Sequence, residues 1–165
     1  MTAANHQTDC WSRKPLSSEW TEVYKYRPYR ASMRLMGLKV ESGEGVLVAT
    51  AAGPVSLSEA ISVFTKVCDV GAEMGFDRIL VDCFSVEGEL STIERYELGR
   101  TVAEYCNSRS ITPKVATVGK PPVINGFAAQ VASNRGLNAE TFSESQKAMD
   151  WLKGFGSKAA AHKVG

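Results

Sequence analysis

Two hydroxyl side chains stand where the sequence marks the start of a helix, and both are candidates for phosphorylation. Ser91 and Thr92 follow a predicted strand and its loop, and Ser91 with Glu94 fits the capping box S-x-x-E. In that motif the serine hydroxyl accepts a hydrogen bond from the Glu94 amide, and the Glu94 carboxylate accepts one from the Ser91 amide. Two further stretches, SLSE (56–59) and SESQ (143–146), follow the same plan. Because the chain uses this pattern three times, capping explains Ser91 without a regulatory role, and we favour capping.

Three carboxylates, Asp82, Glu87 and Glu89, precede that helix. Paired carboxylates can serve as general acid and general base. We expect Asp82 to end a strand, at the edge of an α/β sheet where ligands usually bind. Acidic residues in such a loop also commonly cap backbone amides or lie in solvent. Two functional interpretations therefore stay open: an edge that contacts a ligand or partner, and an enzyme that uses Asp82 with Glu87 or Glu89.

Chemistry based on histidine, paired cysteines or a phosphate loop has little support in the sequence. The only histidines, His6 and His162, lie in terminal segments that we expect to be mobile. The four cysteines are far apart, without the spacing of a zinc or redox site, and we expect Cys83 and Cys106 to be buried free thiols. The run VGKPP (118–122) indicates a turn set by proline rather than an anion loop. We expect no enzyme activity, no metal and no cofactor.

Composition sets the organisation of the chain. With 165 residues, of which 44% are hydrophobic and 22% charged, the chain is one soluble domain with room for an extension. A net charge of +1 gives no reason to expect nucleic acid as a partner. Neither a membrane span nor a secretory signal is expected, so a cytoplasmic location is the default. We predict a weakly ordered extension over 1–34, an α/β domain over 35–155 and a flexible tail over 156–165.

One short run of the extension has a composition of its own. YKYRPYR (24–30) interleaves aromatic and basic side chains, a combination that can stack on bases or contact an anionic partner. We favour aromatic side chains that dock on the domain, because basic patches bind through many contacts and this one is short.

Hydrophobic periodicity predicts the elements that position these residues. Two apolar runs around ESGEG (41–45) indicate a β-hairpin. Single strands and helices then alternate: helix 53–75, strand 78–85, helix 91–107, strand 114–119, helix 121–136, strand 138–143 and helix 144–155. This order predicts an α/β fold with a mixed, mostly parallel sheet of about five strands and about four helices.

Two helices have an apolar side that the spacing suggests. For helix 91–107 we place Ile93, Tyr96, Val102 and Cys106 on one buried stripe. For the closing helix the apolar side includes Trp151, with Ala148 and Leu152 beside it.

The span from Leu35 to Phe155 resembles the STAS superfamily, in particular the branch of uncharacterised bacterial proteins similar to anti-sigma-factor antagonists. Two lines carry the likeness, RILVDCFSVEGELSTIERYELGR (78–100) and PPVINGFAAQVASNRGLNAETFSESQKAMDWL (121–152). The resemblance implies a β-α sandwich that binds a protein partner or a small ligand.

In the antagonists, the resemblance further implies, a serine at the head of the helix after the central strand is phosphorylated by a partner kinase. Ser91, or Thr92 beside it, occupies the matching place. The sequence departs from the antagonist pattern where Leu90 replaces an Asp and Ile93 replaces a Gly. The neighbouring carboxylates also repel the charge that a phosphate adds.

Three functions follow for comparison with the structure. The leading hypothesis is a non-enzymatic regulatory or protein-interaction domain, whose partner is another protein or a second copy of the chain in a homodimer. The second is a carrier of a small molecule or lipid, which requires an apolar cavity of roughly a few hundred Å³ beside the sheet. The third is the carboxylate enzyme described above.

Overall fold

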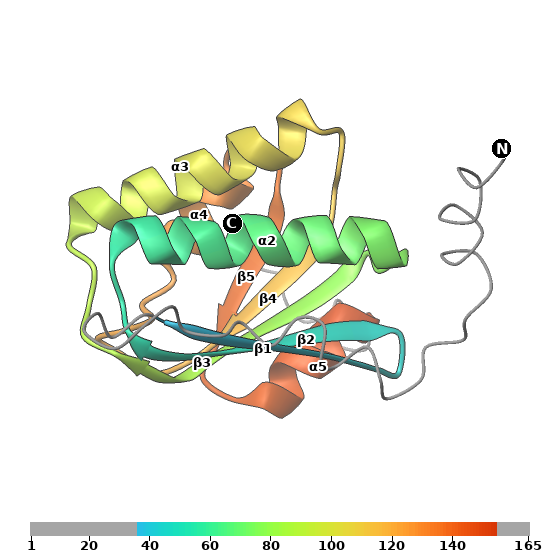
Figure 1. Cartoon of the computed structure of the whole chain (residues 1–165), viewed down its shortest axis with the longest axis horizontal. Coiled ribbons are helices and arrows are strands. Elements are labelled where there is room, and N and C mark those ends of the chain that lie inside the picture. Colours follow the sequence, from blue (N-terminus) through green and yellow to red (C-terminus); the bar gives the residue numbers. More distant parts are fainter. Residues whose placement is uncertain (1–35, 155–165) are drawn as a thin grey trace, which may run out of the picture.

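The computed structural model describes residues 36–154, and the aromatic-basic run, His6, His162 and Cys10 lie outside these residues. The predicted order of strands and helices is confirmed (Figure 1). The elements are β1 (Gly37–Gly43), β2 (Val46–Pro54), α2 (Leu57–Met74), β3 (Arg78–Glu87), α3 (Thr92–Ser108), β4 (Lys114–Val118), α4 (Phe127–Ser133), β5 (Asn138–Phe142) and α5 (Ser145–Lys153).

The strands form one sheet in the order β1-β2-β3-β4-β5. β1 is antiparallel to β2, and each later pair is parallel, because a helix returns the chain to the same edge before the next strand. The hairpin turns at Glu44 and Gly45, where φ is 54° and 77°, as a tight turn between twisted antiparallel strands requires. The mixed, mostly parallel sheet predicted from the sequence is confirmed.

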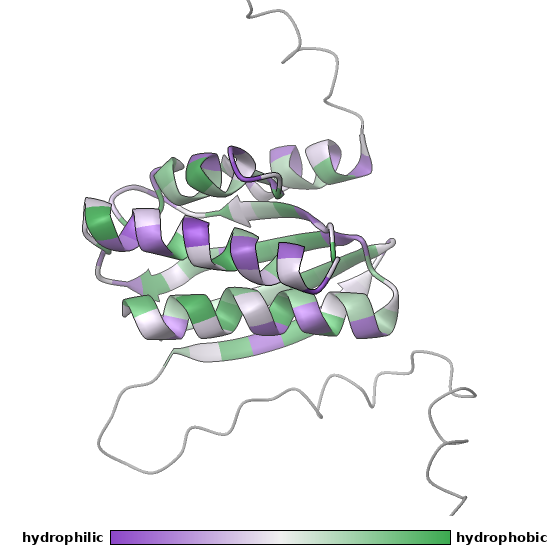
Figure 2. Ribbon diagram, turned by 90° about the horizontal axis from the view of Figure 1, so that it is seen from above, coloured by the Kyte–Doolittle hydropathy of each residue, from purple (hydrophilic) through white to green (hydrophobic). Residues whose placement is uncertain are grey.

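Both faces of the sheet are covered, but unequally. Helices α2, α3 and α4 lie over one face, and α5 is the one helix of residues 36–154 over the other (Figure 1). The strands are mainly hydrophobic, while hydrophilic and hydrophobic positions alternate along the helices (Figure 2). The large core under α2–α4 contains Ile79, Val81 and Cys83 of β3, whereas Leu80 joins the smaller core under α5. Successive side chains of a strand point to opposite faces, so one strand serves both cores.

The stripe predicted for α3 is wrong at two positions. Val102 and Cys106 are buried as predicted, but Ile93 is 76% exposed and Tyr96 is 39% exposed. The buried face continues instead through Leu98 and Gly99 to Arg95. Neither an arginine nor a glycine contributes to an apolar pattern. The pattern therefore indicated the neighbouring face of the helix, which carries Ile93 and Tyr96.

Helix α4 is shorter than predicted. Residues 121–123 form a turn, and the helix begins only at Phe127. Gly126, with φ of 84°, is its N-cap, and this left-handed conformation separates the prolines from the helix. The turn predicted at VGKPP is confirmed.

The capping box predicted at 143–146 is wrong. Helix α5 begins at Ser145 after an N-cap at Glu144, and no side chain caps it, because Ser143 lies one residue too early. Trp151 is also less buried than predicted, and it packs against Phe142 and under the ammonium of Lys114, while Leu152 is fully buried.

Candidate functional site

A β-bulge in β3 shapes the part of the sheet nearest to Ser91. Asp82 pairs with Thr50 of β2 and Ser85 pairs with Ala52, so three steps along β3 oppose two along β2. The Asp82 Oδ1 atom accepts a hydrogen bond of 2.9 Å from the Phe84 amide, across the extra residue. The bulge shifts the alternation of the strand, so that both Cys83 and Val86 line the same pocket.

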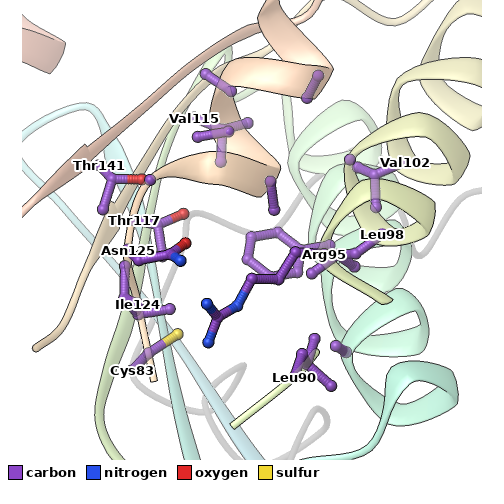
Figure 3. A pocket seen from close by; sticks show the side chains of 18 of the residues that line it. Cys83, Leu90, Arg95, Leu98, Val102, Val115, Thr117, Ile124, Asn125 and Thr141 are labelled. Carbon is purple, nitrogen blue, oxygen red and sulfur yellow. The ribbon is translucent and has the colours of Figure 1, made fainter. Parts of the chain in front are cut away.

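The pocket lies between the sheet and the helices α2, α3 and α4 and has a volume of about 90 Å³. Most of its walls are apolar side chains, among them Leu98, Val102 and Val115 (Figure 3). Thr117, Asn125 and Thr141 add neutral polar groups. Asn125 is exposed, so the pocket reaches the surface beside the loop before α4.

Two glycines let the walls of this pocket approach each other. An added Cβ on Gly99 of α3 would lie 2.3 Å from the Ala128 carbonyl oxygen of α4, so only glycine permits the observed distance between these helices. An added Cβ on Gly119, directly after β4, would lie 2.6 Å from Cγ1 of Ile124, which lines the pocket.

Arg95 is the only charged residue among the described residues that line the pocket. It is 9% exposed, and its guanidinium points from α3 across the pocket towards Cys83, Ile124 and Asn125 (Figure 3). Its Nη2 atom donates to the Pro122 carbonyl oxygen at 2.6 Å and lies 3.9 Å from Oε2 of Glu89. A buried cation needs compensating groups, so this arginine is the unusual feature of the site.

The structure forms the capping box predicted at Ser91 in full. The Ser91 hydroxyl accepts from the Glu94 amide at 3.3 Å, and the Ser91 amide and hydroxyl each lie 2.8 Å from the same oxygen of the Glu94 carboxylate. These hydrogen bonds, that of the amide first, lower the pKa of Glu94. Thr92 is the exposed first residue of α3. At 56–59 only half of the predicted capping box forms. The Ser56 hydroxyl accepts a hydrogen bond from the Glu59 amide, but the Glu59 carboxylate accepts from the Met36 amide and not from the Ser56 amide.

The three candidate carboxylates do not share one site. The prediction that Asp82 ends its strand is wrong, since β3 continues to Glu87. Asp82 alternates with Val81 and Cys83, so its side chain leaves the sheet on the α5 face, away from the pocket. Glu89 lies beside Arg95, and the Glu87 carbonyl accepts from the Val55 amide at 2.9 Å. The carboxylates of Asp82 and Glu89 thus have separate partners, and for Glu87 the contact is made by the backbone.

The prediction of free buried thiols is confirmed for Cys83 and Cys106, and it holds for Cys68 as well. Burial, with the nearby charge of Asp82, raises the pKa of Cys83 to about 12. A hydrogen bond with Cys106 and burial raise the pKa of Cys68. Cys83 therefore lines the pocket as a neutral thiol rather than as a thiolate nucleophile.

Membrane-spanning helices and clusters of metal-binding side chains are both absent from the described residues. Between residues 36 and 154 no helix combines the length and the apolar character needed to cross a membrane. In the same range, no three histidine, cysteine or acidic side chains come together as a metal site would require.

The geometry defines an α/β sandwich domain with an apolar pocket that contains one buried arginine. No model of a known protein family matches the chain, and no curated protein matches it. Among solved structures, an uncharacterised protein of the DUF3478 family from Shewanella loihica PV-4, described as having a SpoIIAA-like fold, is similar at 15% identity with a TM-score of 0.45. The match covers 75% of this chain and 98% of that chain.

The STAS resemblance of the sequence stays a prediction that this similarity does not test. Similarity at this level carries no argument about function. The proposals that follow depend only on residues of this chain.

Proposed function

We propose that this domain is a non-enzymatic binding domain that takes a small apolar group in the pocket between the sheet and helices α3 and α4. The observation that carries the proposal is the pocket itself, apolar on most of its walls, with a single buried cation and an opening beside Asn125. Ligand sites are typically apolar with a few polar groups that fix orientation, and this composition fits that description.

The size of the pocket limits the ligand. A volume of about 90 Å³ is below the few hundred Å³ that the carrier hypothesis required, so the pocket does not hold a whole lipid. An engineered cavity of about 150 Å³ holds benzene. By the same scale this pocket holds an apolar group of roughly four non-hydrogen atoms, with any further part of the ligand at the opening.

Three features support binding rather than catalysis. Cys83 is the thiol at the pocket wall, and its raised pKa keeps it protonated near neutral pH. The Ser91 hydroxyl is engaged by Glu94, and Asp82 lies on the other face of the sheet from Glu89. Of these groups, Ser91 contacts a carboxylate, that of Glu94, but this pair caps the helix and neither residue lines the pocket.

Filling the pocket tests the proposal. We expect short-chain compounds (1-butanol, 1-hexanol and hexanoate) to shift amide NMR signals of pocket residues in the native chain. Ala129→Leu, which adds a side chain to a pocket-lining position, should abolish these shifts. Ala72→Leu places the same side chain on the exposed side of α2 and should leave them unchanged. If none of the compounds perturbs the pocket, the proposal is wrong.

A second function, contact with a protein partner, is favoured by exposed apolar side chains. Ile93 is 76% exposed and shares a face of α3 with Tyr96, since residues three apart on a helix are neighbours. For a homodimer through this face, sedimentation should show a dimer that Ile93→Ser shifts towards monomer, while Thr101→Ser on the same helix does not. A chain that sediments as a monomer at every concentration contradicts the homodimer.

A further inference from the structure

The buried arginine leaves hydrogen-bonding capacity that the protein itself does not use. Both contacts of Arg95, to Pro122 and to Glu89, involve Nη2. Within residues 36–154 its Nε and Nη1 atoms form no hydrogen bond and no ion pair. Every fully buried side-chain nitrogen or oxygen in this range has a partner, so both atoms keep some accessible surface, and the guanidinium points across the pocket (Figure 3). The guanidinium is therefore positioned to donate to a ligand.

The charge around Arg95 selects the kind of acceptor. The pocket lining holds one positive residue and, among the described residues, no negative one. Glu89 approaches only to 3.9 Å, and its side chain is 61% exposed, so it offsets the buried charge weakly. A ligand with one negative charge would balance Arg95, whereas a phosphate with about two would exceed it and would also meet Glu89.

Resting on the proposed function, we propose that the ligand is a short-chain monocarboxylate, whose carboxylate accepts two hydrogen bonds from Arg95 and whose apolar chain packs against Leu98, Val102 and Val115. A two-donor edge of the guanidinium consists of Nη2 with either Nη1 or Nε, and the Nη2 N–H that does not donate to Pro122 is available for it. A carboxylate matches such an edge as a bidentate pair, which is stronger and more directional than a neutral hydrogen bond. A neutral ligand of the same shape would cover Arg95 without balancing its charge, and an unbalanced buried charge is costly. The arginine therefore discriminates strongly against such a ligand.

A matched set of six-carbon probes tests this class of ligand. We expect hexanoate to bind the native full-length chain at least tenfold more tightly than 1-hexanol or hexylamine at pH 7, measured by amide NMR titration. Hexyl phosphate should bind more weakly than hexanoate, because its second charge has no partner. Arg95→Met should reduce hexanoate affinity to that of 1-hexanol. Arg100→Met, on the same helix but in surface pairs with Glu97 and Glu104, is the control and should change neither.

Glu89→Gln keeps the test decisive if Arg95→Met does not fold. Since Glu89 competes for the guanidinium, its neutralisation should raise hexanoate affinity several-fold and leave 1-hexanol unchanged. Equal binding of hexanoate and 1-hexanol overturns the carboxylate proposal and leaves the proposed function standing. Tighter binding of hexyl phosphate overturns it in the same way. If no probe binds, both proposals fall.

Discussion

The Ser91 hydroxyl and amide hydrogen-bond to Glu94 at the head of α3, and the Ser91 carbonyl oxygen accepts from the Arg95 amide. A phosphate on the same oxygen would add about two negative charges within a few ångströms of the Glu94 carboxylate. It would break the box that starts the helix. Phosphorylation of Ser91 or Thr92 stays a prediction that nothing in the structure requires.

The contribution of the Ser91 cap can be measured against Ser143, a serine in a similar sequence pattern that caps no helix. Ser91→Ala should lower the free energy of unfolding by about 1 kcal/mol, because the Glu94 amide loses its acceptor. Ser143→Ala, at the box that does not form, should change it by less than about 0.5 kcal/mol. Urea unfolding at pH 7 measures both. Equal costs would contradict the assigned caps.

The same pair predicts a pH dependence. Glu94 has a lowered pKa in the folded state, so its ionised form favours folding above its ordinary pKa, and this stability is lost as the pH falls through the folded value. Ser91→Ala should raise the Glu94 pKa, measured by NMR, and should reduce the loss of stability between pH 7 and pH 3. The Ser91 amide, which remains, keeps the pKa of Glu94 below its usual range.

The buried thiol of Cys83 should make the protein less stable as the pH rises, the opposite of the effect of Glu94. Its folded pKa of about 12 exceeds the unfolded value, so unfolding is favoured as the pH rises from about 9 towards 12, by at most about 1.4 kcal/mol per pH unit. Cys83→Ala should lose less stability than the native chain between pH 9 and pH 11. Val81→Ala, a buried neighbour that does not titrate, should follow the native pH profile. A Cys83→Ala profile parallel to the native one would show that the thiol does not titrate on unfolding.

At the scale of elements, the sequence predicted every strand and helix of the described range but not the pocket. Periodicity and turn residues report whether an element exists, because each element must bury one apolar face. The pocket depends on a charged residue that faces inward and on a bulge, and neither has an apolar signal. Extending the Leu98, Val102 and Cys106 face by one helical turn towards the N-terminus reaches Arg95, and this spacing was the available clue.

Gly99 sets the distance between α3 and α4 and can be tested directly. In an exposed helix Gly99→Ala would stabilise by about 1 kcal/mol. Here the new Cβ would lie 2.3 Å from a backbone oxygen that cannot move alone, and we expect a net loss of about 2 kcal/mol. Gly43→Ala, with no atom within 4 Å of the added Cβ, is the control. A stabilising Gly99→Ala variant would mean that the two helices separate easily.

At the scale of the whole molecule, the sheet divides the described domain into a large core that contains the pocket and a small core under α5. The strands contribute side chains to both cores, so a cavity-forming substitution in either core should destabilise the same sheet. A pocket in the larger core is tolerable because the remainder of that core, and the separate one under α5, still hold the strands together.

Leu152 tests whether the two cores unfold as one unit. It is 1% exposed under the sheet, so Leu152→Ala should cost about 2–5 kcal/mol, whereas Trp151→Ala, only partly buried, should cost less. If the cores are coupled, Leu152→Ala lowers the hydrogen-exchange protection of β3 amides under α2–α4 as much as that of α5. A loss of protection confined to α5 would show that this helix opens alone, and that the pocket side of the sheet is stable without it.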